Sequence, residues 1–472
     1  MSAAVRWMGL GMAAALWAGT VMAEPAVIPE SALPTVQELQ RKALAGAGAY
    51  ELVESLTTEV GARLPGTPGD AAGVKWAVAK LKELGFDKVW TEPVQVDGWI
   101  RGKETASVKA PFPQPLQITA LGHTAPTPPG GLEADIAFFP TLDALKAAPD
   151  GSLKGKIAYV GQRTIRAQDG AGYGESVGMR VQGASEAARK GAAGLLIRSV
   201  GTDSHRFPHT GVMRYHEDDK ARIPAAALSA PDADLIERML QRGKPVRVHM
   251  ELTPEFPGPV TSHNVIGEIR GSEAPEEIVL IGAHLDSWDL GTGALDDGAG
   301  VAIVTAAAKL IKELPKAPRR TVRVVLFAAE EVGLVGAKAY AAAHAAELDK
   351  HVVAMEADFG AGPVWRFDTR FAEEALPAGE LIHRALLPLG VTRGHNQATG
   401  GPDIGPLVAA GVPAATLYMD GTDYFDFHHT SDDTLDKVDA GKLNQSVAAY
   451  ATFVWLAAQA KGEFRGKTVQ AH

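Results

Sequence analysis

Residues 278–300 read IVLIGAHLDSWDLGTGALDDGAG, a short β-rich apolar run followed by a glycine-rich loop. Similar β-rich runs recur at 322–328, 352–357 and 414–418, and helical segments separate them. Strands that alternate with helices predict a largely parallel sheet with helices on both faces. The expected fold class is therefore α/β, with a mostly parallel mixed sheet sandwiched by helices.

Side chains that bind metals follow the end of each run. They are His284 after the first run, Glu330 and Glu331 after the second, Asp358 after the third, and His429 in the loop after the fourth. Asp296 lies in the glycine-rich loop, before a helix expected to begin near Gly300. Each motif alone could be a surface turn or a helix cap. Because such sheets bind ligands beyond the carboxyl ends of their strands, the recurrence predicts one site.

The chemistry of these side chains suits zinc, which accepts imidazole nitrogen and carboxylate oxygen. Two imidazoles and three carboxylates are too many for one open catalytic ion, whereas two ions about 3.5–4 Å apart would share a carboxylate and use them all. The predicted ligand sets are His284, Asp296 and Asp358 for one zinc, and Asp296, Glu331 and His429 for the other. Glu330 remains free to act as general acid and base.

Two further aspartates are candidates for orienting these ligands. Asp286 stands two residues after His284, so its carboxylate could accept the second ring N–H of that histidine and assist catalysis. Asp433 could serve His429 in the same way. His428 competes with His429 for the ligand position, and spacing alone does not separate the two. We interpret three histidines in a polar loop of the middle region as ordinary surface residues: His205, His209 and His216.

The motifs together resemble the zinc aminopeptidase and glutamate carboxypeptidase family. They are GARLPGTPG at 61–69, NVIGEIRGSEAPEEIVLIGAHLDSWDLGTGALDDGAG at 264–300, LFAAEEVGLVGA at 326–337, MEAD at 355–358 and FHHTSDDT at 427–434. The resemblance implies the same five ligands and Glu330 as base. It selects His429 over His428, because the family's last ligand is followed directly by Thr or Ser. GGPDIG at 400–405 is similar to a loop near the substrate, which makes Gly401 and Asp403 candidate substrate contacts. His428, beside the last ligand, is a third candidate.

The middle of the chain has its own βαβ rhythm. GKIAYV at 155–160, ARKGAAGLLI at 188–197 and RIPAAALS at 222–229 resemble the protease-associated domain, a module inserted in several exopeptidases. We therefore expect four parts: a signal peptide at 1–23, an N-terminal catalytic part at 24–120, an inserted domain at 121–252 and the main catalytic part at 253–472. The inserted domain is expected to overhang the site or to support a homodimer.

Charge and composition exclude several classes of partner. The 472 residues carry a formal net charge of -10, without the basic clusters that nucleic acids or anionic membranes require. Arg6, the apolar run 7–17 and the small residues up to Ala23 are typical of a secretory signal peptide. The apolar run is shorter than the roughly 20 residues of a membrane span, so no stable membrane insertion is expected after cleavage. An exported protein, periplasmic or secreted, is expected, and without cysteine it has no disulfides.

The expected function is a di-zinc exopeptidase acting on short peptides. The resemblance favours dipeptides with both ends free, and a broad aminopeptidase is the alternative. A glutaminyl-cyclase-like acyltransferase with one zinc and a non-catalytic binding protein are further alternatives. The pocket for the terminal group stays open: Asp403, Asp423 and Asp426 could receive an ammonium, whereas Arg393, His395 and Asn396 could receive a carboxylate.

Overall fold

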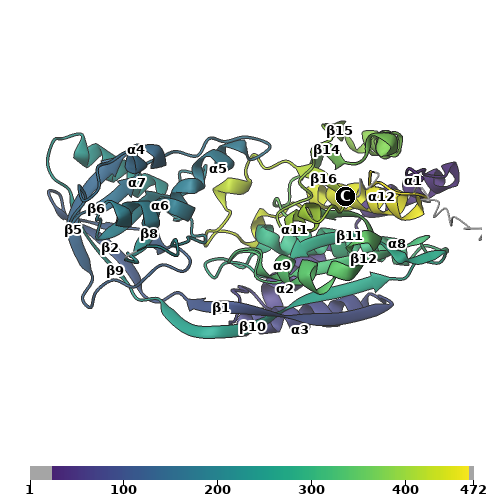
Figure 1. Cartoon of the computed structure of the whole chain (residues 1–472), viewed down its shortest axis with the longest axis horizontal. Helices are drawn as coiled ribbons and strands as arrows, with labels where there is room; N and C mark the ends of the chain where they lie inside the picture. Colours follow the sequence, from purple (N-terminus) through teal and green to yellow (C-terminus); the bar gives the residue numbers. More distant parts are fainter. Residues whose placement is uncertain (1–23, 220, 467–472) are drawn as a thin grey trace, which may run out of the picture.

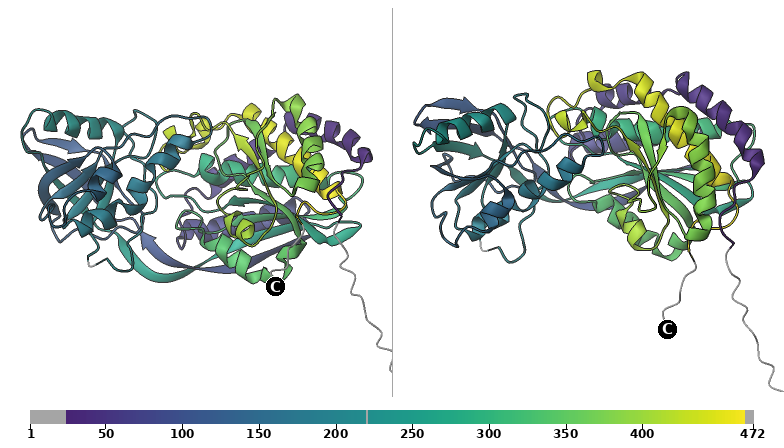
Figure 2. Two further views of the ribbon diagram at one scale, coloured as in Figure 1. Left: turned by 45° about the horizontal axis from the view of Figure 1, so that its top comes forward. Right: turned by 90° about the horizontal axis from the view of Figure 1, so that it is seen from above.

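The computed structural model describes residues 24–219 and 221–466, which contain two eight-stranded sheets and the helices that pack on them (Figure 1). Each sheet belongs to its own lobe, and the two lobes lie side by side along the long axis of the molecule (Figure 2). The predicted signal peptide at 1–23 lies outside the described residues. Within the described residues, no helix combines the length and the apolar character needed to cross a membrane.

The main lobe contains the predicted parallel strands. Its strand order is β1 (Lys88–Ile100), β10 (Glu255–Ile269), β12 (Arg320–Phe327), β11 (Ala274–His284), β13 (His351–Glu356), β16 (Ala414–Met419), β14 (Val364–Arg370) and β15 (Thr392–Arg393). The neighbours β12, β11, β13 and β16 run parallel, and they are the four runs found in the sequence. Antiparallel partners flank them, so the predicted mixed sheet is confirmed.

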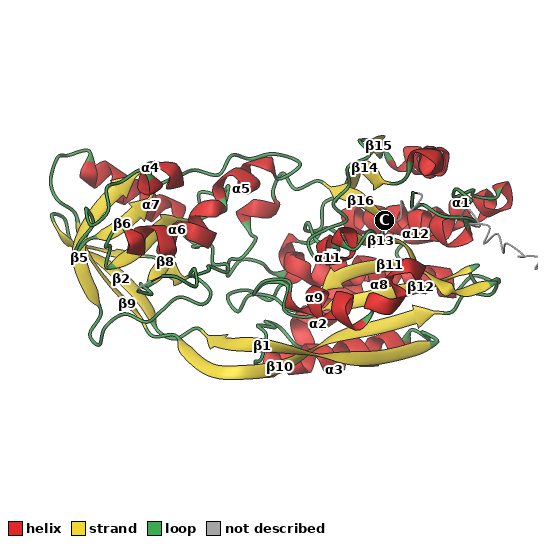
Figure 3. Ribbon diagram, in the orientation of Figure 1, coloured by secondary structure: helices red, strands yellow, loops and turns green. Residues whose placement is uncertain are grey.

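Helices cover both faces of this sheet, as Figure 3 shows. One face packs on α1 (Leu33–Leu44), α2 (Ala49–Glu59), α3 (Pro68–Glu83), α8 (Ala299–Lys312), α10 (Leu376–Leu386) and α12 (Ala440–Gln459). The other face packs on α9 (Val335–Ala343) and α11 (Gly405–Ala409). Within β11, Val279 and Ile281 face the first layer while Ile278 and Leu280 face the second. Burial on both faces explains why the strand reads as continuously apolar.

The second sheet occupies residues 104–252, which we call the inserted lobe. Its order is β3 (Gln114–Leu116), β2 (Glu104–Ala110), β9 (Arg247–Leu252), β5 (Leu132–Phe139), β6 (Ile157–Val160), β7 (Gly194–Arg198), β8 (Ala225–Leu228) and β4 (Ile118–Ala120). The helices α4 (Leu142–Lys146), α5 (Ala171–Ser176), α6 (Gly178–Arg189) and α7 (Ala230–Leu240) accompany it. The sheet begins before residue 121, where we had placed the boundary, because β2 pairs antiparallel with β9. Local sequence gives no sign of this distant pairing.

A long two-stranded ribbon joins the lobes. Strands β1 and β10 pair antiparallel from Lys88 opposite Glu268 to Ile100 opposite Glu255. The chain therefore enters and leaves the inserted lobe at neighbouring points of one ribbon (Figure 1). The segment after β16 also reaches toward the inserted lobe, so the two lobes meet at a second place (Figures 1 and 2).

Candidate functional site

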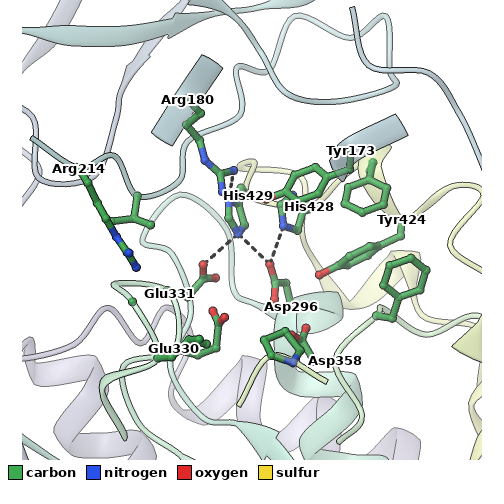
Figure 4. A pocket seen from close by; sticks show the side chains of 16 residues that line it. Tyr173, Arg180, Arg214, Asp296, Glu330, Glu331, Asp358, Tyr424, His428 and His429 are labelled. Carbon is green, nitrogen blue, oxygen red and sulfur yellow. Dashed lines mark hydrogen bonds and ion pairs between the residues drawn. The ribbon is translucent and has the colours of Figure 1, made fainter. Parts of the chain in front are cut away.

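The predicted ligands meet at the carboxyl edge of the four parallel strands. His284 ends β11, the pair Glu330 and Glu331 follows β12, Asp358 follows β13, and His429 lies in the loop after β16. Asp296 lies in the turn before α8. Figure 4 shows Asp296, Glu330, Glu331, Asp358 and His429 around one pocket. Segments far apart in sequence are thus brought together by the parallel order of the strands.

Asp296 stands between two histidines. Its Oδ1 lies 3.0 Å from His284 Nε2, and its Oδ2 lies 3.2 Å from His429 Nε2. Each histidine has a second carboxylate nearby: Asp358 Oδ1 is 3.7 Å from His284 Nε2, and Glu331 Oε2 is 2.9 Å from His429 Nε2. The result is two adjacent clusters, each of one imidazole and two carboxylates, and Asp296 belongs to both.

The negative charge of these two clusters suits bound cations. The buried oxygen Glu331 Oε1 has no hydrogen-bond partner among the described residues. Burial lowers the pKa of His284, but the carboxylates of Asp286, Asp296 and Asp358 outweigh it and raise this pKa well above its usual value. Unpaired carboxylate oxygens in a buried site are costly unless a cation compensates them. Divalent cations would supply that compensation.

Glu330 and Glu331 both line the pocket, but only Glu331 lies close to His429, at 2.9 Å. Burial raises the pKa of Glu330 well above the usual range, assisted by the charges of Glu331 and Asp358. The carboxylate of Asp286 accepts hydrogen bonds from the backbone N–H of Glu330 at 3.0 Å and of Glu331 at 3.2 Å. This contact fixes the turn after β12 from which the two glutamate side chains diverge.

The structure gives Asp286 a different role from the one expected. The closest partner of His284 Nδ1 is the backbone carbonyl of Asp286 at 3.0 Å, while the Asp286 carboxylate is 3.7 Å away. Asp433 also differs: its carboxylate accepts from the backbone N–H of Leu295 at 2.6 Å and of Asp296 at 3.2 Å, so it positions the shared aspartate. Sequence spacing cannot tell a ring partner from a backbone partner.

A buried arginine from the segment 61–69 supports the same loops. Arg63 is fully buried and donates to the carbonyls of Leu285, Thr292 and Gly293. These carbonyls lie on both sides of the glycine-rich loop, so one guanidinium holds the loop that carries Asp296. The motif 61–69 therefore acts as a scaffold.

The inserted lobe contributes directly to the site. His429 Nδ1 lies 3.2 Å from the carbonyl of Thr210 and 3.3 Å from Arg180 Nη1. His209, which we interpreted as a surface residue, is 1% exposed and links Asp203 at 2.8 Å to the carbonyl of His428 at 2.7 Å. That interpretation was wrong, because the loop after β16 covers it. His205 and His216 are exposed, as expected.

His428 lies in the pocket beside His429. The two rings stack with centroids 3.5 Å apart, and His428 Nε2 is 3.5 Å from Asp296 Oδ2. Burial lowers the pKa of His428 well below its usual value, with His429 adding to the effect. His428 could therefore bind a metal together with Asp296 and His429, but unlike His429 it has no short contact to Glu331.

The predicted substrate loop is placed differently from the expectation. Asp403 is buried, its backbone N–H donates to Glu356 Oε2 at 2.8 Å, and its side chain does not line the pocket. Gly401 has a φ of +113°, and a Cβ there would lie 2.4 Å from Glu356 Oε2. Pro402, between them, is the member of this loop that lines the pocket.

The other terminal-group candidates have partners elsewhere. Asp423 and Asp426 form ion pairs with Arg166 at 2.9 and 2.6 Å. Arg393 pairs with Glu380, His395 with Asp368, and Asn396 bonds to the backbone of Phe371. None of the six predicted candidates is among the residues that line the pocket.

The pocket has a volume of about 350 Å³ and contains four functional candidates that sequence reasoning missed. They are Tyr173, Arg180 and Arg214 from the inserted lobe and Tyr424 from the loop after β16 (Figure 4). None lies in a strand-end motif, and three come from a lobe with no recognisable catalytic cluster. Only the tertiary contact between the lobes reveals them.

Comparison with known proteins agrees with this arrangement. Residues 264–454 match the family model described as peptidase family M28. Carboxypeptidase Q of Mus musculus is 36% identical over 87% of this chain and 85% of its own length, and that of Homo sapiens is 35% identical over the same shares. A peptidase M28 precursor from Shewanella amazonensis SB2B is 54% identical over 93% of this chain and 99% of its own, with a TM-score of 0.90. An aminopeptidase from Aneurinibacillus, 21% identical over 93% of this chain and 98% of its own, shares the fold with a TM-score of 0.63. The resemblance inferred from the motifs is thereby confirmed, and the chain belongs to peptidase family M28.

Proposed function

We propose that this chain is a di-zinc exopeptidase that hydrolyses short peptides. The observation that carries the proposal is the position of Asp296, whose two carboxylate oxygens face His284 at 3.0 Å and His429 at 3.2 Å. A carboxylate shared between two histidine–carboxylate clusters suits a pair of zinc ions. The relatives named carboxypeptidase Q support the exopeptidase assignment.

In this proposal the chain's own residues divide the chemistry. His284, Asp296 and Asp358 would hold one zinc, and Asp296, Glu331 and His429 the other. The ions, when bound, polarise the scissile carbonyl and activate water. Glu330 accepts the proton of the attacking water and delivers it to the leaving amine, a role that its raised pKa favours. His428 borders the substrate.

The proposal extends to substrate and location. Dipeptides with both ends free are the preferred substrates, since the relatives named carboxypeptidase Q point to recognition of the carboxyl end. Export to the periplasm or medium rests on the signal-like residues 6–23. The inserted lobe acts as a domain over the active site, and its contacts to His428 and His429 support this role. A homodimer stays a prediction.

Metal analysis and a peptide assay test the function together. Purified protein should contain two zinc ions per chain and should release amino acids from free dipeptides, and a chelator should abolish this release. One tightly held zinc with cyclising activity would instead favour the glutaminyl-cyclase alternative. Two zinc ions without hydrolysis of any peptide would favour a binding protein and refute the proposal.

A further inference from the structure

A buried arginine of the inserted lobe faces the proposed metal site. Arg180, on α6, is 5% exposed and lines the pocket together with Glu330, Glu331 and His429. Figure 4 shows its guanidinium beside His429, across the pocket from Glu330. Arg214, also from the inserted lobe, lines the same pocket near its mouth and is exposed.

The contacts of Arg180 are all with uncharged groups or a histidine. Nη2 donates to the Tyr173 hydroxyl at 2.8 Å, and Nη1 lies 3.5 Å from the Thr210 carbonyl and 3.3 Å from His429 Nδ1. Its buried Nε has no hydrogen-bond partner in the part of the chain that the structure describes. Over the same residues, no carboxylate lies within the 4.0 Å of an ion pair.

Other buried arginines of this protein are compensated. Arg198 pairs with Asp234, Arg320 with Glu277 and Arg323 with Glu268. Arg63 has no such pair but is surrounded by backbone carbonyls. Arg180 therefore stands apart, because burying a charge without a counter-ion costs free energy that an anionic ligand would recover.

The backbone is shaped around this guanidinium. Gly211 has a φ of +132°, and a Cβ at that position would lie 2.4 Å from Arg180 Cζ. The centroid of the Tyr173 ring lies 5.5 Å from Arg180 Cζ, so the ring packs against the guanidinium as well as accepting its hydrogen bond. A guanidinium held in a fixed orientation can bind both oxygens of a carboxylate with two parallel hydrogen bonds.

We propose that Arg180 binds the C-terminal carboxylate of the substrate, with Arg214 as a second cation at the mouth of the pocket. This inference rests on the proposed exopeptidase function and specifies which peptide end is read. The C-terminal residue of the substrate, which follows the scissile bond, lies between the metal-binding clusters and Arg180. The enzyme consequently releases single C-terminal residues, and peptides that end in an amide are poor substrates.

The test compares a free dipeptide, Ala-Leu, with its amide, Ala-Leu-NH2. The kcat/KM of the wild type for Ala-Leu should be roughly 10- to 100-fold higher than its kcat/KM for Ala-Leu-NH2, the usual effect of one charged hydrogen bond. Arg180→Met should lose about that factor on Ala-Leu and change little on the amide. Arg189→Met is the matched control, because Arg189 lies on the same helix and pairs at the surface with Asp218.

A purely structural role of Arg180 gives a different pattern. If Arg180 only supported Thr210 and His429, the Arg180→Met variant would lose zinc or would slow both substrates equally, and either result would overturn the inference. Equal cleavage of both substrates by the wild type would overturn it as well.

Calorimetry separates this inference from the proposed function. In a Glu330→Gln background, which should keep its zinc, Ala-Leu is expected to bind more tightly than its amide. Addition of Arg180→Met should remove this preference. Absence of hydrolysis in the wild type would refute the proposed function, while the calorimetric preference would still support recognition of the carboxylate. Absence of any preference would overturn the inference whatever the activity.

Discussion

Adjacent glutamates can perform different tasks because one aspartate fixes the turn beneath them. The Asp286 carboxylate holds the N–H groups of both residues, and only Glu331 reaches His429, at 2.9 Å. We predict that Glu330→Gln keeps its zinc but slows turnover by about two to four decades, the usual contribution of a positioned acid or base. Glu331→Ala should lose zinc. Zinc content and turnover of the two variants check this, and reversed phenotypes would contradict the assignment.

The roles of the neighbouring residues His428 and His429 can be distinguished in the same way. His429 lies close to both Asp296 and Glu331, whereas His428 lies 3.5 Å from Asp296 and stacks on His429. We expect His429→Ala to lose one zinc per chain and His428→Ala to keep both while raising KM. Elemental analysis of the two variants decides between them. Loss of zinc from the His428 variant alone would reverse the roles of the two residues.

The stability of the metal-free protein should depend on pH. Burial, with the charge of Asp358, raises the pKa of Glu356 from 4.5 to about 8. Burial lowers the pKa of His429, but Glu331 and Asp296 outweigh it and raise this pKa from 6.5 to about 9. Both groups hold protons in the folded state that the unfolded chain releases at lower pH. Their stabilisation is therefore full only below their unfolded pKa values and is lost as the pH rises through about 8 and 9.

Urea unfolding with a chelator at pH 7 and pH 9 measures this effect. We predict that the free energy of unfolding falls by roughly 1–3 kcal/mol between these values. Glu356→Gln should reduce the fall, because it removes one of the two groups. Stability that increases over this interval would show that other groups dominate.

At the level of elements, the loop after β16 depends on the inserted lobe for its position. His209 bonds to the carbonyl of His428, and Thr202 donates its backbone N–H to the carbonyl of Phe425 at 3.0 Å. We predict that His209→Ala weakens zinc binding by about tenfold, an effect typical of residues that orient ligands indirectly. The exposed His205→Ala is the control and should bind zinc as the wild type does. Zinc titration of the metal-free variants measures the difference.

The same level shows what the sequence can and cannot predict. Strands β11, β12, β13 and β16 were predicted because each is a short apolar run, and a metal-binding side chain stands at its end or in the loop that follows. Parallel order places these ends together. The start of the inserted lobe was missed because β2 pairs with β9, which is distant in sequence. Arg180 and His209 were missed because their roles depend on contacts between lobes. Local patterns carry the elements, whereas contacts between distant elements decide the substrate side of the site.

At the level of the whole molecule, metal should stabilise the lobes unequally. The proposed ligands all belong to the main lobe, where their carboxylates repel one another without metal. The inserted lobe has its own sheet and one core cluster of its own, and it shares a second cluster with Leu64, Trp99 and Trp288. Because zinc would bind only the folded site, we expect its removal to lower the stability of the main lobe by about 4 kcal/mol per ion where free zinc exceeds its Kd about 1,000-fold.

Tryptophan fluorescence reports mainly on the main lobe, because residues 104–252 contain no tryptophan and, of the described tryptophans, only Trp99 and Trp288 pack in the core of the inserted lobe. Trp76 and Trp455 lie in the core of the main lobe. We predict that a chelator lowers the fluorescence midpoint in a thermal melt more than it lowers the late part of the circular dichroism transition, to which the inserted lobe contributes. His429→Ala, which should lack one zinc, is expected to show a smaller shift on chelation. If fluorescence and dichroism instead move together by the same amount, the lobes unfold as one cooperative unit, and the contacts of Thr210 and His209 with the loop after β16 are strong enough to couple them.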